Sequence, residues 1–134
     1  MVFYEKSPRN VRLSEIKTLT NFDKKNSTFV AVTVNPSDQF LKTNLVGIFD
    51  FIQLHGEETK ARVTEIKNMG FKVIKTIKVK EAEDINKYRE FDNADIILFD
   101  TPGMEKSLEF PKNLITKLPS GTKYAVAGSI SEDN

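Results

Sequence analysis

The regular alternation of strand-like and helix-like segments is the feature that most constrains the fold of this chain. Runs of β-branched and aromatic residues predict strands at 29–34, 49–54, 71–79, 95–99 and 124–127, and the end of another strand at 2–4. Apolar residues at helical spacing fall between them, around 13–19, 40–41, 57–69, 81–91 and 114–118. Because helical crossovers join parallel strands, the pattern predicts an α/β fold with helices packed over a parallel sheet.

Two ways of arranging such a sheet compete. A (βα)8 barrel needs roughly 200 residues or more, whereas an open, flavodoxin-like sheet of about five strands suits a single domain of this length. Neither G-x-G-x-x-G nor G-x-x-x-x-G-K-[ST] occurs in the 134 residues. A dinucleotide or ATP site of the usual kind is therefore not expected.

Composition narrows the classes of function. The chain has no cysteine and one histidine, which excludes disulfides, a thiolate nucleophile, zinc–cysteine sites and a His-based metal cluster. No metal and no cofactor are expected. Its net charge is +1 and no basic run exceeds two residues, so neither nucleic acid nor an anionic membrane is an expected partner. Without an apolar signal core or a run of membrane-spanning length, a cytoplasmic location is expected.

The stretch FDFIQLHGEET at 49–59 contains the first candidate site. An apolar strand ends there in Gln53, His55 and Gly56, and a charged helical pattern follows. The carboxyl ends of parallel strands are where α/β folds bind ligands, so these polar residues are predicted to lie at a site. Glu57 and Glu58 suit the first turn of the following helix.

Three further features of the elements are predicted. Gly70 is placed as the C-cap of the helix at 57–69. The strand at 95–99 is nearly continuous in apolar residues, which predicts burial on both faces. Lys75 and Lys78, three residues apart in a strand, are predicted to point to opposite faces. The commoner interpretation of such lysines is that both are solvated at the edge of the sheet; the alternative is that one of them points into a barrel interior.

Five segments of the chain stand out together. They are FYEKSPR at 3–9, FIQLHGEE at 51–58, VIKTIKV at 73–79, ILFDT at 97–101 and AVAGSISEDN at 125–134. Together they resemble the phosphoribosylanthranilate isomerase family of tryptophan biosynthesis and follow the family's order over nearly the whole chain; QLHG after a strand and the E-x-S-P-R turn are the most specific. The resemblance implies a (βα)8 (TIM) barrel, of which residues 1–134 form a single incomplete domain from the second strand to the seventh.

The family resemblance implies an Amadori rearrangement, an aldose–ketose isomerisation of N-(5-phosphoribosyl)anthranilate. Such a reaction needs a general acid at the furanose oxygen and a base at C2. By resemblance Asp100 is the acid, and the apolar run IILF before it suits a carboxyl group that must hold its proton. Without the resemblance, Asp100 would be interpreted as a turn aspartate.

Substrate-binding residues follow from the same resemblance. Arg9 is placed on the anthranilate carboxylate, which a guanidinium fork can bind through two hydrogen bonds; otherwise it is an exposed surface arginine. Gln53 and His55 are placed at the mouth of the barrel, although His55 as a hydrogen-bonded structural histidine stays open. Gly128 is placed at the phosphate.

The departures from the family pattern concern catalysis. The family's general base is a cysteine that ends the first barrel strand, and no cysteine is present. The loop at 101–107 is short, and Gly128 stands alone where the family has a glycine pair, which weakens the backbone approach to phosphate. The isolated chain is therefore expected to be inactive, and Glu57 and His55 are the first candidates for any other base.

Three hypotheses about function remain. One is an isomerase-like enzyme for a small phosphosugar–anthranilate substrate, whose site is completed from outside the chain. Another is a non-catalytic barrel fragment that forms homo-oligomers through exposed sheet edges near 2–4 and 124–127. The third is an open-sheet signalling module, which the lack of an acidic phosphoacceptor cluster disfavours.

Overall fold

The chain folds around one parallel sheet. The computed structural model describes residues 1–21, 25–100 and 118–128. Within them six strands pair in parallel, each with the next in the chain. The strands are β1 (Val2–Phe3), β2 (Val30–Thr33), β3 (Phe51–Leu54), β4 (Lys72–Lys78), β5 (Ile96–Asp100) and β6 (Tyr124–Ala127).

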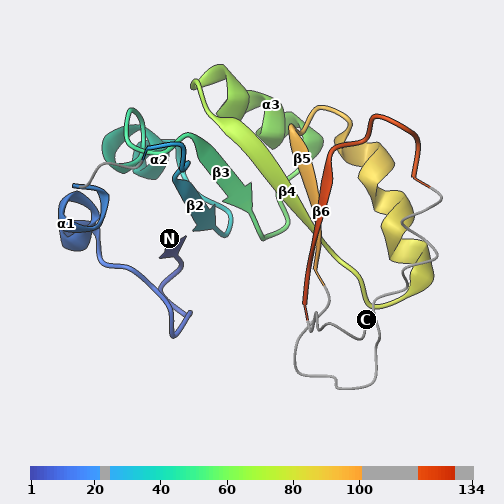
Figure 1. Cartoon of the computed structure of the whole chain (residues 1–134), viewed down its shortest axis with the longest axis horizontal. Coiled ribbons are helices and arrows are strands. Elements are labelled where there is room, and N and C mark those ends of the chain that lie inside the picture. Colours follow the sequence, from blue (N-terminus) through green and yellow to red (C-terminus); the bar gives the residue numbers. More distant parts are fainter. Residues whose placement is uncertain (22–24, 101–117, 129–134) are drawn as a thin grey trace.

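The strand order decides between the two predicted arrangements. Barrel strands follow chain order, whereas a flavodoxin-like sheet reverses its order at a switch point. Here the order is β1-β2-β3-β4-β5-β6, so the barrel-like prediction is confirmed and the flavodoxin-like alternative is wrong. Among the described residues β1 pairs only with β2 and β6 only with β5, which leaves the sheet open (Figure 1).

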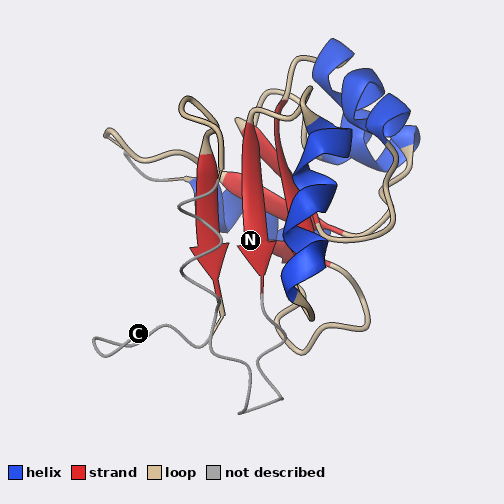
Figure 2. Ribbon diagram, turned by 90° about the vertical axis from the view of Figure 1, so that its right-hand side faces the viewer, coloured by secondary structure: helices blue, strands red, loops and turns tan. Residues whose placement is uncertain are grey.

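Helices follow each of the first four strands and gather on one side of the sheet (Figure 2). α3 packs on β4, and η2 packs on β4 and β5. η1 and η2 are tighter 3-10 helices, where the sequence predicts helix without distinguishing the type. The helices are η1 (Leu13–Glu15), α1 (Ile16–Thr20), α2 (Asp38–Asn44), α3 (Lys60–Asn68) and η2 (Ala82–Phe91).

The core lies between the sheet and these helices. On the helix side of β2, β3 and β4, Ala31, Ile52 and Val73 are fully buried and pack with Val63 and Ile66 of α3. A second cluster joins η2 to β4 and β5, and comprises Ile77, Val79, Ile85, Ile97 and Phe99. Apolar burial against these helices is what holds the layers together.

Most residues on the opposite face of the sheet are only partly buried, with Thr76 as an exception. Alternate residues of β5 show the difference, because Ile97 and Phe99 are buried whereas Ile96 and Leu98 are partly exposed. The prediction that the strand at 95–99 is buried on both faces is therefore wrong. Helices cover one face alone in the described part of the chain, and nothing packs over the other.

The boundaries of α3 differ from the prediction at one end. The helix begins at Lys60, and the side chain of its N-cap, Thr59, accepts a hydrogen bond from the Arg62 N–H at 3.2 Å. Glu57 and Glu58 therefore precede the helix, so the prediction that they lie in its first turn is wrong. The Glu58 carboxylate makes other contacts, which are described below. At the other end the C-cap is Met69, one residue before the predicted Gly70, which directly follows it.

Some predictions fall outside the described residues. These are the loop at 101–107, most of the helix around 114–118 and the helix start at 131–133. The structure describes no helix that is both long enough and apolar enough to cross a membrane.

Candidate functional site

The carboxyl ends of the strands bring the predicted site residues to one edge of the sheet. His55 follows β3 and Asp100 ends β5, with β4 between them. The His55 Nε2 and Asp100 Oδ2 atoms are 3.5 Å apart, and both side chains are partly exposed. This distance is long for a hydrogen bond but short enough for strong electrostatic coupling. The sequence predicts both residues at the carboxyl ends of strands, and the structure places them there, next to each other.

Arg9 shares a cavity with His55. The cavity has a volume of about 410 Å³, and its polar lining includes Arg9, His55, Glu57 and Lys78. Arg9 lies in the turn after β1, where its N–H donates to the Ser7 Oγ at 3.1 Å. Two cations face one carboxylate in this lining, so the cavity favours an anionic ligand.

The surroundings of His55 favour its neutral form. Burial lowers the pKa of His55 below its ordinary value, and the positive charges of Lys78 and Lys75 lower it further, against the opposing effect of Asp100. A neutral imidazole beside a carboxylate presents Nε2–H to it, which leaves Nδ1 as an acceptor. Among the described residues Nδ1 is buried without a hydrogen-bond partner.

Gln53 and Gly128 flank this edge. The Gln53 side chain donates to the Thr76 Oγ1 of β4 at 3.3 Å, on the half-buried face of the sheet. Gly128 directly follows β6, whose last residue Ala127 pairs with Asp100. Its φ of 134° favours glycine. The substrate-binding roles of both residues stay predictions.

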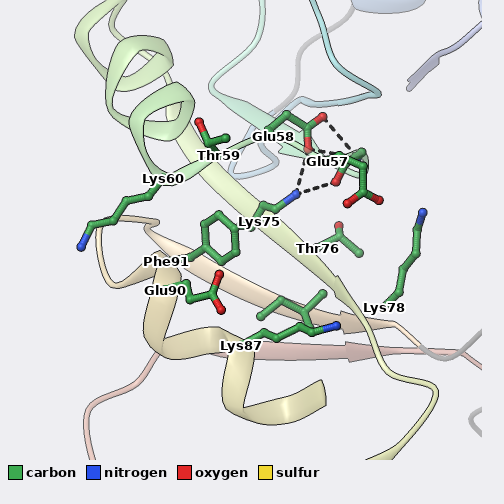
Figure 3. Close-up of a pocket in the computed structure, with 12 residues that line it drawn as sticks. Glu57, Glu58, Thr59, Lys60, Lys75, Thr76, Lys78, Lys87, Glu90 and Phe91 are labelled. Carbon is green, nitrogen blue, oxygen red and sulfur yellow. Dashed lines mark hydrogen bonds and ion pairs between the residues drawn. The ribbon is translucent and has the colours of Figure 1, made fainter. Parts of the chain in front are cut away.

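One buried pair beside the site is not predicted by the sequence. Lys75 is 3% exposed and Glu58 is 5% exposed, and their charged atoms lie 2.8 Å apart. Figure 3 shows the Lys75 ammonium directed at the Glu58 carboxylate, with the Phe91 ring beside the lysine side chain. The explanation of Lys75 as a solvated edge residue is wrong, whereas Lys78 is exposed. A lysine amid the apolar residues of VIKTIKV is the signal that could have indicated a buried partner.

A second cavity of about 420 Å³ borders the same loop. Gly56, Glu57 and Lys78 line both cavities. The backbone conformation of the loop at 55–58 therefore affects the shape of both. The part of the chain that the structure describes contains no group of three His, Asp or Glu side chains suited to a metal ion.

Sequence comparison matches the chain to one protein family and to named relatives. A family model described as N-(5'phosphoribosyl)anthranilate (PRA) isomerase matches residues 1–134. An N-(5'-phosphoribosyl)anthranilate isomerase of a Sulfurihydrogenibium species is 38% identical over 144 residues, covering 100% of this chain and 67% of the relative. The same-named protein of Mesorhizobium japonicum is 32% identical, covering 99% and 65%. The chain spans about two thirds of the length of these curated relatives.

Structural comparison supports the same fold. The crystal structure of phosphoribosyl anthranilate isomerase from Thermotoga maritima matches with a TM-score of 0.86 at 23% identity, covering 100% of this chain and 67% of that one. Another such isomerase, in complex with reduced 1-(o-carboxyphenylamino)-1-deoxyribulose 5-phosphate, matches with a TM-score of 0.83 over 65% of its length. Together with the family match over all 134 residues, these findings show that the chain belongs to the N-(5'-phosphoribosyl)anthranilate isomerase family.

Proposed function

We propose that the carboxyl edge of this sheet is the substrate site of an N-(5'-phosphoribosyl)anthranilate isomerase. The observation that carries the proposal is the placement of Asp100 3.5 Å from His55, next to the cavity that Arg9 lines. An acid, an imidazole and a carboxylate-binding cation are thereby gathered at the edge where α/β folds bind their ligands.

Each residue has a distinct task in the proposed Amadori rearrangement. Arg9 binds the anthranilate carboxylate and orients the substrate. Asp100 donates its proton to the furanose oxygen as the bond between that oxygen and C1 breaks. A base then removes the C2 proton, and the resulting enolamine tautomerises to the aminoketose. The 134 residues contain no cysteine, so we assign the base to a group outside them.

The proposed setting follows from this substrate. The ligand is a small phosphosugar–anthranilate, and tryptophan biosynthesis in the cytoplasm is its expected context. Neither a nucleic acid nor a membrane is proposed as a partner.

Binding of reduced 1-(o-carboxyphenylamino)-1-deoxyribulose 5-phosphate, a reduced form of the proposed product, tests the site without any need for turnover. The chain is expected to bind it, with a change in the NMR signals of its single histidine, His55. Arg9→Gln is expected to weaken binding roughly 10- to 100-fold, since a hydrogen bond to a charged group contributes about 1.5–3 kcal/mol. Arg12→Gln is the matched control, because Arg12 is an exposed arginine of the same segment that lines a different cavity. Equal weakening by both substitutions would contradict the role of Arg9.

Self-association is a second proposed property, and it rests on the open sheet. The outer edge of β6 is a four-residue row of backbone groups with no strand beside it among the described residues, whereas β1 is only two residues long. Unpaired edges of this kind readily pair with another chain. The proposal is supported by a similar solved structure, that of monomers generated from the dimeric phosphoribosylanthranilate isomerase of Thermotoga maritima, because that relative forms a dimer.

Light scattering tests the proposed edge pairing. At high micromolar concentration the chain is expected to have at least twice the monomer mass, through pairing of β6 strands. Ala125→Lys, which places a charge on that edge, is expected to restore the monomer. Ala61→Lys, at an exposed position of α3, is the control and is expected to leave the mass unchanged. A monomeric parent chain would contradict the proposal.

A further inference from the structure

The Glu58–Lys75 pair lies immediately behind the loop that carries His55. Lys75 is in β4, in the same row across the sheet as Leu54 and Ile97, which are both buried apolar residues on the helix side. Removing two charges from water costs several kcal/mol per ion, so an apolar pair of similar size would stabilise the fold about as well. Stability alone therefore does not account for these two residues.

The Glu58 carboxylate joins three separate parts of the chain. One oxygen accepts the Asn35 N–H of the β2–α2 loop at 2.7 Å. The other accepts the Gly56 N–H at 3.0 Å and the Lys75 ammonium at 2.8 Å. Lys75 in turn donates to the Gly56 carbonyl oxygen at 2.8 Å. The pair therefore holds Gly56 by both of its backbone groups.

These contacts fix the backbone on both sides of His55. The His55 N–H donates to the Thr33 carbonyl oxygen at 2.9 Å, and Gly56 is clamped as described. The packing around Gly56 is close, since a Cβ there would lie 2.7 Å from Asn35 Oδ1 and 2.9 Å from Glu58 Oε1. The same Asn35 oxygen accepts the Glu57 N–H at 3.1 Å. Little freedom is left for the backbone that directs the imidazole.

We propose that Glu58 and Lys75 are positioning residues, whose buried ion pair holds the loop at 55–57 so that His55 faces Asp100 across β4. They act through the Gly56 backbone and do not themselves reach the ligand cavity that Arg9 lines. The inference concerns the site of the proposed function, but the His55–Asp100 geometry that it explains can be measured without substrate. Its outcome is therefore independent of whether the chain binds the analogue or supports isomerisation.

The single histidine makes the experiment specific. An NMR pH titration of His55 in the full chain gives its pKa, and the change on Asp100→Asn measures the coupling between the two residues. The other charged groups that face His55 are Lys78, Lys75 and Glu58, with Arg9 and Glu57 in the shared cavity. Comparing the effect of Asp100→Asn within one background cancels their direct contributions.

Glu58→Met with Lys75→Met is the test variant, because it removes both charges together and leaves no buried charge unpaired. In the parent, Asp100→Asn is expected to lower the pKa of His55, since a nearby carboxylate favours the imidazolium. In the double variant this lowering is expected to fall to roughly half or less, because the coupling weakens with distance and solvent access. An undiminished effect of Asp100→Asn in the folded double variant would overturn the proposal.

Two further variants separate positioning from a general loss of structure. Glu58→Gln keeps an acceptor for the Asn35 and Gly56 N–H groups, and is expected to retain more of the coupling than the double variant. Lys60→Met with Asp92→Asn removes an exposed lysine–carboxylate pair of similar length, 2.7 Å, and is expected to leave the coupling unchanged. Should this control lower the coupling as much as the double variant, the effect would not be specific to the buried pair and the proposal would fail.

Discussion

Phe99→Ala is expected to lower the free energy of unfolding by about 3–5 kcal/mol, the usual cost of truncating a buried phenylalanine. Phe99 is fully buried on the helix side of β5, where it packs with Ile77, Ile85 and Ile97. Truncation would leave a cavity that the surrounding strands and η2 cannot close. This loss is a large fraction of the roughly 5–15 kcal/mol of stability that a domain typically has.

Leu98→Ala is the matched comparison on the same strand. Leu98 points to the opposite, half-buried face, so its truncation is expected to cost about 1 kcal/mol. Urea unfolding of both variants at low protein concentration gives the two values, since dilution limits any covering of that face by a second chain. Equal losses would show that the face assigned as uncovered is packed as tightly as the helix side.

Much of the fold could be predicted from the sequence because its signals are local. Runs such as FVAVTV and VIKTIKV carry their strand preference within a few residues, and β2 and β4 lie inside them. Gly70 marks the end of α3 to within one residue because a C-cap is a local backbone requirement. The positions of His55 and Asp100 follow equally simply, since each comes directly after an apolar strand.

What could not be predicted depends on contacts between distant residues. Glu58 looks like a helix-start carboxylate, yet its partner Lys75 is 17 residues away and on the next strand. The apolar run around Lys75 indicates that the lysine is buried, but no local pattern identifies Glu58 as its partner. The prediction that β5 is buried on both faces failed for a similar reason. Apolar residues on both faces allow a strand to be buried on either side, but they do not show which side the helices cover.

The second large effect is expected in the growth of a tryptophan auxotroph that lacks the isomerase and expresses this chain. The chain alone is expected not to support growth, because its 134 residues hold the proposed acid Asp100 but no cysteine. General acid–base groups each contribute roughly a hundredfold to ten-thousandfold to rate, so loss of the base reduces turnover severely. A co-expressed segment that carries a family-type first strand, ending in the cysteine that the family resemblance implies as the base, would supply the missing group. Growth is then expected to return.

The same growth assay, carried out with Asp100→Asn, is the most direct test of the proposed site. With the co-expressed segment present, the account predicts growth that is lost on Asp100→Asn in this chain and also on Cys→Ser at the family's base in the segment. Asp92→Asn, in an exposed aspartate of the same chain, is the control and is expected to leave growth intact. Growth that survives Asp100→Asn would contradict the assignment of the acid. Growth with this chain alone would contradict the assignment of the base, and Glu57 and His55 would be the side chains to replace next.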